Sequence, residues 1–217
     1  MDNDDDAHFL RRNELLAPGI IKALKGRNIE AVYCRAKEDA LAAALAMLPR
    51  EASISWGGSR TLNEIGLLDA LRTGGYRVID RDAAPDPDER LARMRRALTC
   101  DVFLTSVNAI SEDGQMVNVD NLGNRVAAMA FGPARVIVVA GMNKVCKTVE
   151  DAVVRARTFA APVNAARMGL KDTPCAHTGA CADCKSPDCI CCSVVITRRS
   201  RVPGRMRVIL VGERVGF

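Results

Sequence analysis

Most of the cysteines of this chain are concentrated in one short tract near its carboxyl end. The tract holds Cys175, Cys181, Cys184, Cys189, Cys191 and Cys192. Thiolates packed this closely repel one another and are reactive, so such clusters bind a soft metal or an iron–sulfur cluster, or they form disulfides. The CxxC pair at Cys181 and Cys184 could serve either purpose, because its sulfurs can share a metal or reach each other. The tract therefore predicts a thiolate site whose occupant the spacing leaves open.

Four thiolates suit either tetrahedral zinc or a [4Fe–4S] cluster. Cys175, Cys181 and Cys184 would supply three ligands, and one of the three following cysteines would supply the fourth. The usual ferredoxin run of cysteines is absent. A purely structural metal is the alternative, because a metal can replace a hydrophobic core in a short loop-rich insert such as residues 174–192.

A glycine-rich segment is the second candidate for chemistry. It comprises Gly57, Gly58, Ser59, Arg60 and Thr61, and it lies between a short apolar run and a helical pattern. Glycines let the backbone approach a ligand, and the free N–H groups at a helix start favour an anion. The segment is neither a Walker loop nor a GxGxxG fingerprint. It predicts either an anion-binding loop or a plain strand-to-helix turn.

Two further loops carry polar side chains where a ligand could bind. Residues 105–128 form a long polar segment, and connecting loops are usually shorter, although Asn and Asp also form ordinary turns. Its candidate ligand-binding residues are Asn118, Asp120, Asn121, Gly123, Asn124 and Arg125. Asn143 and Lys144 follow the most apolar strand, which is where open α/β sheets bind ligands. Lys144 would then neutralise a phosphate or carboxylate, unless it is an exposed lysine at a helix start.

Strand and helix patterns alternate along the chain. Strands are expected at residues 29–34, 53–56, 76–79, 101–106, 134–141, 193–197 and 206–211. Helices are expected at residues 8–27, 37–48, after Arg60, and at 84–99, 123–131 and 148–160, with a kink or break at Pro18-Gly19. Residues 107–119 predict a β-hairpin turning at Glu112–Gly114. This alternation predicts an α/β fold, with helices on both faces of a parallel sheet, in one domain of residues 1–217.

Composition and charge indicate which kinds of protein this chain could be. The 217 residues are 48% hydrophobic and only 4% aromatic, as is usual for helices packed on a parallel sheet. No apolar run is long enough to span a bilayer, and the acidic start lacks the order of a secretory signal, so we expect a cytoplasmic protein with reduced thiols. The net charge is +5, with arginines concentrated after residue 197. That patch would face an anionic ligand or an acidic partner, or be solvated; scarce aromatics make nucleic acid an unlikely partner.

These loops and the last strand together resemble the LUD-domain family of lactate-utilisation proteins. The matching segments are GGSRTLNEIGLLDAL, NAISEDGQMVNVDNLGNRVAA, GPARVIVVAGMNKV, PCAHTGACADCKSP and VILVGERVGF. They extend from about Glu30 to the end, and the cysteine tract is similar to that of one cysteine-bearing branch. The resemblance implies a fold like that of ribose-5-phosphate isomerase, glucosamine-6-phosphate deaminase and the coenzyme A transferases.

The resemblance also implies a role in lactate or organic-acid utilisation. Some members belong to an iron–sulfur-containing system that oxidises L-lactate to pyruvate. We therefore expect a subunit that binds a small anionic substrate and works with other subunits of an oxidation complex. That setting favours a [4Fe–4S] cluster over zinc. The branch tends to keep a cysteine after the isoleucine at Ile190, which implies the ligand set Cys175, Cys181, Cys184 and Cys191.

An enzyme is the alternative implied by the same fold. It would act on a phosphorylated or coenzyme A-type substrate and carry a structural zinc site. The resemblance assigns no catalytic residue, because the transferases' catalytic glutamate has no secure counterpart here. Glu64 and Glu112 lie near the relevant loops, but neither sits in a motif that supports the assignment.

Overall fold

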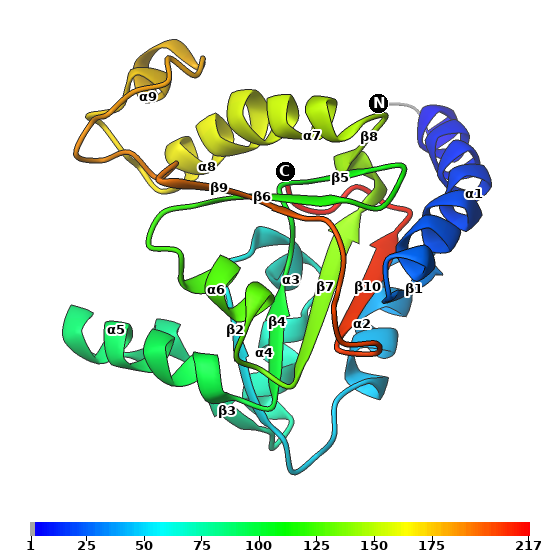
Figure 1. Ribbon diagram of the computed structural model, residues 1–217, viewed down its shortest axis with the longest axis horizontal. Helices are drawn as coiled ribbons and strands as arrows, with labels where there is room; N and C mark the ends of the chain where they lie inside the picture. Colours follow the sequence, from blue (N-terminus) through cyan, green and yellow to red (C-terminus); the bar gives the residue numbers. More distant parts are fainter. Residues whose placement is uncertain (1–2) are drawn as a thin grey trace.

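A computed structural model describes residues 3–217, and its central feature is a six-stranded, all-parallel sheet (Figure 1). Every neighbouring pair in this sheet is parallel. In sheet order the strands are β1 (Ile29–Cys34), β10 (Met206–Val211), β7 (Arg135–Gly141), β4 (Val102–Thr105), β2 (Ser53–Trp56) and β3 (Arg77–Ile79). The predicted parallel sheet is confirmed.

Helices cover both faces of this sheet, as predicted. Helices α1 (Asn3–Gly26) and α6 (Asn124–Ala130) cover one face, and α2 (Lys37–Ala46), α3 (Arg60–Glu64) and α4 (Leu67–Thr73) cover the other. The remaining α-helices of the described chain are α5 (Pro87–Arg96), α7 (Val149–Arg155), α8 (Ala161–Arg167) and α9 (Pro174–Thr178). Within residues 3–217, no helix combines the length and the apolar character needed to cross a membrane.

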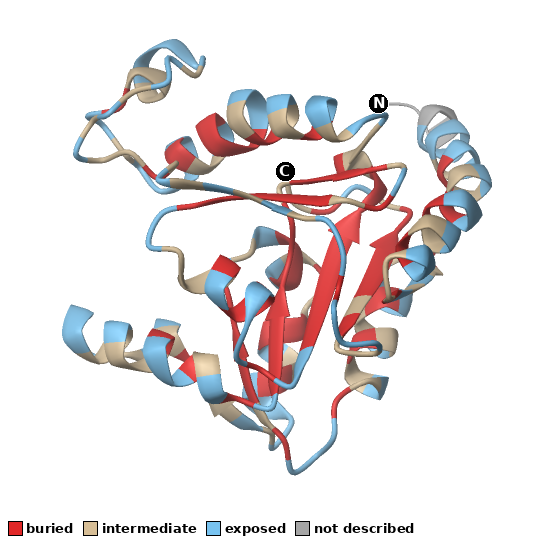
Figure 2. Ribbon diagram, viewed as in Figure 1, coloured by how far each residue is buried: buried red, intermediate tan, exposed pale blue. Residues whose placement is uncertain are grey.

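The β-branched run of β7 shows why the sheet is buried on both sides. Val136 and Val138 point into the core shared with α1 and α6, whereas Ile137 and Val139 point into the core shared with α2, α3 and α4. Successive side chains of a strand face opposite sides, so a continuous apolar run suits a strand covered twice. Figure 2 shows this burial along the strands.

A second sheet of four strands lies beyond the large one, and it was not predicted. Its order is β8 (Val145–Cys146), β5 (Ala109–Ser111), β6 (Met116–Asp120) and β9 (Ser193–Thr197). The expected hairpin is confirmed as the antiparallel pair β5 and β6. Helix α7 packs on this sheet through Ala152, which touches Ala109 and Val117 in a small third core. The strands on either side of the arginine-rich loop, β9 and β10, therefore belong to different sheets.

Two expectations about helices are wrong in detail. Pro18 does not divide α1, which runs without interruption from Asn3 to Gly26. The helix expected to end near residue 160 continues through a π-helical turn, Ala156–Ala160, into α8. Pro162 comes directly after this π-helical turn, where the regular i→i−4 hydrogen bonding is already interrupted.

Candidate functional site

A cleft of about 670 Å³ lies at the carboxyl ends of the parallel strands. Its walls include the segments that follow β2, β3, β4 and β7, together with the end of β6 and the residues from there to Arg125. This is the edge at which open parallel sheets bind ligands, and the volume is in the range of small-molecule sites. The three loops singled out from the sequence therefore converge on one cavity.

Cationic side chains dominate the cleft. Of the described residues that line it, seven are basic, namely Arg60, Arg72, Arg81, Arg90, Arg125, Lys144 and Arg167. The acidic ones are Asp82 and Asp120. A cavity of one charge sign concentrates ligands of the opposite sign. The cleft is therefore suited to an anionic ligand.

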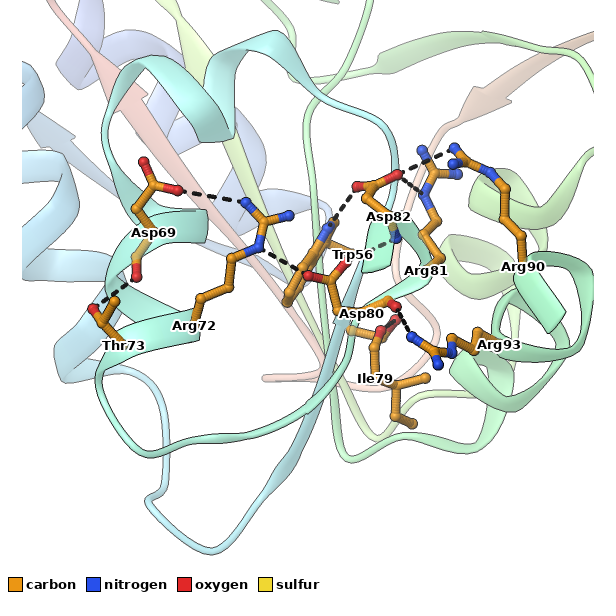
Figure 3. A network of polar contacts seen from close by, with 11 residues as sticks. Trp56, Asp69, Arg72, Thr73, Ile79, Asp80, Arg81, Asp82, Arg90 and Arg93 are labelled. Carbon is orange, nitrogen blue, oxygen red and sulfur yellow. Dashed lines mark hydrogen bonds and ion pairs between the residues drawn. The ribbon is translucent and has the colours of Figure 1, made fainter. Parts of the chain in front are cut away.

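Asp82 is shared among several donors at one end of the cleft (Figure 3). Its carboxylate lies 3.1 Å from Arg90 and 3.5 Å from Arg81, and it accepts a 3.3 Å hydrogen bond from the indole of Trp56. The Arg81 Nε atom is buried and makes no hydrogen bond to any residue in the described part of the chain. Burial lowers the pKa of Arg81, and the nearby arginines add to that effect. Asp82 alone faces both Arg81 and Arg90, so an anion bound here would offset the positive charge that this one carboxylate leaves.

Gly58 borders the same charge. A Cβ at this position would lie 2.5 Å from an Arg81 guanidinium nitrogen. The absence of a side chain at residue 58 thus lets the guanidinium rest against the backbone of the glycine-rich loop.

A separate ion pair fixes the wall between β3 and α4. Arg72 donates to Asp80 at 2.8 Å and also contacts Asp69 at 3.4 Å (Figure 3). Burial alone would raise the pKa of Asp80, but hydrogen bonds from Arg72 and from the Asp82 amide lower it below its usual value. Asp80 is therefore held as a carboxylate, and Arg72 is largely neutralised by its partners.

Arg125 joins the first two loops. It pairs with Asp120 at 3.0 Å and donates to the Asn108 side chain at 3.1 Å. Its stem lies 3.1 Å from where a Cβ of residue 57 would be, so Gly57 leaves the space that Arg125 occupies. Asp120 also accepts from the amide of Gly123, whose φ of +78° favours glycine. Asp120 therefore links the backbone conformation at Gly123 to the position of the Arg125 charge.

Lys144 lies at the floor of the cleft, with 3% of its surface exposed. Its Nζ donates to Thr61 Oγ1 at 2.8 Å, to Ser106 Oγ at 2.9 Å and to the Val107 carbonyl at 3.2 Å. Burial, followed by the charges of nearby arginines, lowers the pKa of Lys144 to about 7. The alternative of an exposed lysine is wrong, and an amine that titrates near neutrality is available to the cleft.

Two of the expected ligand-binding residues point away from the cleft. Asn118 is fully buried, and its amide donates to the sulfur of Met129 at 3.4 Å. Asn143 hydrogen-bonds the backbone of Val215 and Gly216 at 3.3 Å. Both serve packing in this structure: Asn118 anchors β6 to α6, and Asn143 ties the segment after β10 to the end of β7.

The cysteine tract surrounds a second, smaller cavity of about 160 Å³. Its cysteine lining comprises Cys175, Cys181, Cys184, Cys189 and Cys191. Burial, followed by the nearby thiolate charges of Cys189 and then Cys181, raises the pKa of Cys191 to about 12. The expected four ligands therefore face one cavity, with Cys189 beside them.

The thiols are not drawn together into a metal-binding arrangement. All cysteines are free, and within residues 3–217 no three His, Cys, Asp or Glu side chains are placed to hold a metal ion. Cys192 is exposed and directs its sulfur to Asn121 Oδ1 at 3.4 Å. A shared metal would require the cavity-lining sulfurs to close in on one point.

The cleft and the cysteine cavity are neighbours. Ile190 lines both of them, and Asn121, the partner of Cys192, lines the cleft. The tract projects from the end of α8, on the same side of the molecule as the cleft wall formed by Asn164 and Arg167.

Comparison with known proteins identifies the family. The model of the LUD domain matches residues 18–211, which is most of the chain. The chain belongs to the LUD-domain family. Among solved structures, this LUD protein is similar to a DUF162 family protein from Deinococcus radiodurans, with a TM-score of 0.50 and 15% identity over 92% of this chain and 98% of the other. At that identity the likeness shows the fold. A search of curated proteins gave no match.

The site of this LUD protein includes residues that the sequence patterns did not single out as ligand-binding. They include Arg72, Arg81, Arg90 and Arg167, whereas Ser106 and Asn108 lie in the polar segment 105–128 that was already a candidate ligand loop. Arg81 could have been found, because it follows the predicted strand 76–79 at its carboxyl end. Arg90 and Arg167 lie on helices that approach the cleft only through tertiary packing, and no local pattern marks them.

Proposed function

We propose that this LUD protein acts in lactate or organic-acid utilisation as a subunit with two sites. The cleft binds a small anionic ligand, and the cysteine cavity holds a thiolate-ligated metal or iron–sulfur centre. The LUD family is associated with lactate utilisation, which supports the coarse role. The observation that carries the two-site proposal is their adjacency across Ile190.

The proposed ligands of the centre are Cys175, Cys181, Cys184 and Cys191. A [4Fe–4S] cluster at this place would supply one-electron transfer close to the anion in the cleft. The chain's own contribution is to hold the thiols around one cavity and to present cationic side chains to the ligand beside it. Other subunits of an oxidation complex would exchange electrons with the centre.

The centre is tested by purifying the protein without oxygen, supplying iron and sulfide, and recording the visible absorption spectrum. A broad absorption that is lost in Cys181→Ser is expected, because this thiol lines the cavity. Cys192→Ser is the matched control and should keep the spectrum, since Cys192 is exposed and is not among the described lining residues. A colourless protein with one equivalent of zinc would reject the cluster, and a metal-free protein would reject the centre.

A second candidate is an enzyme acting on a phosphorylated or coenzyme A-type substrate, with a structural zinc ion at the cysteines. The size of the cleft favours it, because about 670 Å³ with seven basic side chains exceeds what one small carboxylate needs. Calorimetric titration with lactate, pyrophosphate and coenzyme A separates the two. Binding of lactate alone supports the first proposal, and binding of the phosphorylated compounds alone supports the second.

A further inference from the structure

The cleft contains a hydroxyl–amine cluster that ligand binding alone does not require. We propose that Ser106 is a nucleophile for acyl transfer, with Lys144 as its base and Thr61 as a positioning residue. The substrate class is a carboxylic ester that carries an anionic group. This inference does not depend on the cysteine centre.

The geometry places all three groups within hydrogen-bond distance of one another. Lys144 Nζ is 2.9 Å from Ser106 Oγ and 2.8 Å from Thr61 Oγ1, and the two hydroxyl oxygens are 3.2 Å apart. Ser106 directly follows β4, a central strand of the parallel sheet, so it occupies the ligand-binding edge. A nucleophile within hydrogen-bond reach of a base, which is itself oriented by a third group, is the arrangement that activates a hydroxyl.

The cluster can hold Lys144 with or without its extra proton. As an ammonium, Nζ donates to Thr61, Ser106 and the Val107 carbonyl, which use its three protons. As a neutral amine, it can donate to the carbonyl and to Thr61, and its lone pair is then left for the Ser106 hydroxyl. A group that must accept and return a proton needs both states to be accommodated.

The charged groups facing Lys144 favour the neutral amine. Arg155 from α7 and Arg125 from α6 oppose protonation, whereas Glu64 from α3 favours it, and burial is the largest influence. Glu64 is itself occupied, because it accepts hydrogen bonds from Arg60 and from the amide of Gly216. The base is therefore available near neutral pH.

The acyl-transfer steps use only groups that the cleft holds. Lys144 takes the proton of Ser106 as the serine oxygen forms a bond to the ester carbonyl carbon. Arg125 donates to the main-chain carbonyl of Ser106 at 3.4 Å, so its positive charge lies next to the residue on which the oxyanion would develop. The bond to the alcohol oxygen breaks, and that oxygen takes the proton from Lys144. Water then attacks the acyl-serine in the same way, and the net reaction is ester plus water to acid plus alcohol.

The test is covalent labelling of the full chain with a fluorophosphonate, followed by peptide mass spectrometry. We expect one label, on Ser106, and a labelling rate that rises with pH through about 7 as the amine loses its proton. Ser106→Ala should abolish labelling, and Lys144→Met should slow it by at least about 100-fold, the lower range for loss of a general base. Hydrolysis of p-nitrophenyl hemisuccinate should follow the same order.

Lys147→Met is the matched control, because Lys147 lies three residues further along the chain, just beyond β8, and is exposed and paired with Glu112. It should label like the unmodified protein. Labelling should also be the same whether or not iron and sulfide have been supplied, which separates this result from the fate of the cysteine centre. If Lys144→Met does not fold, the pH dependence of labelling in the unmodified protein still tests whether an amine acts as the base for Ser106. Absence of a label on Ser106, labelling elsewhere only, or a rate independent of pH between 5.5 and 9 would overturn the assignment.

Discussion

An Arg125→Met variant is expected to lose about 3–5 kcal/mol of unfolding free energy, the usual cost of removing one member of a buried ion pair. Asp120 is 8% exposed and Arg125 is 14% exposed, so methionine would leave a poorly solvated carboxylate without its partner. The change would also remove the hydrogen bond that Arg125 donates to the Asn108 side chain. The loss should appear in urea unfolding followed by circular dichroism.

Arg60→Met is the control for this variant, since it removes an arginine of the same cleft that is 57% exposed and pairs with Glu64 one helical turn away. It should change stability by less than about 1 kcal/mol. An Arg125→Met/Asp120→Asn double variant should recover part of the loss, because the buried charge is gone. Equal losses in the two single variants would contradict the burial of the Arg125–Asp120 pair.

A Gly132→Ala variant is expected to lose about 3 kcal/mol, because two penalties act together. Gly132 has a φ of +115°, a region that residues with side chains rarely adopt. A Cβ there would also overlap the carbonyl oxygen of Leu98, which is backbone and cannot rotate away. The shift in the urea midpoint measures the loss.

Gly19→Ala is the matched substitution with the opposite expected sign. Gly19 lies inside α1, and a Cβ there would meet nothing within 4 Å. Alanine should therefore stabilise the protein by about 0.5–1 kcal/mol through helix propensity. A destabilised Gly19→Ala would contradict the continuous helix through Pro18, and a neutral Gly132→Ala would contradict the close approach of Leu98.

Local patterns predicted the large sheet well because its inner strands are buried on both faces. The unbroken β-branched run of β7 and the helices between strands leave few alternatives to a parallel sheet. The small sheet could not be predicted in the same way. Its strand β8 has only the residues Val145 and Cys146, and β9 joins β6 across a wide sequence separation. Pairing of this kind depends on tertiary packing, which periodicity does not report.

The sequence predicted where the candidate site lies, but it did not predict how its side chains contact one another. The glycine-rich segment pointed to Gly58, the long polar segment to Arg125, and the position after a buried strand to Lys144, and all three line the cleft. What a lysine does, however, depends on its burial and on its partners. Thr61, Ser106 and Lys144 are far apart in the chain, and only the folded sheet brings their side chains together. Polar residues of similar type, such as Asn118, instead turn inward to pack.

The position of β10 has a consequence for how this chain is made. The strand lies between β1 and β7, yet it is synthesised after both of them. While the ribosome is still translating, the facing edges of β1 and β7 have no strand to bond, and their exposed amides and carbonyls can recruit other extended segments. These two strand edges therefore stay unpaired until β10 (Met206–Val211) has been synthesised and can insert between them. During that interval we expect the nascent chain to need chaperones that cover unpaired strand edges.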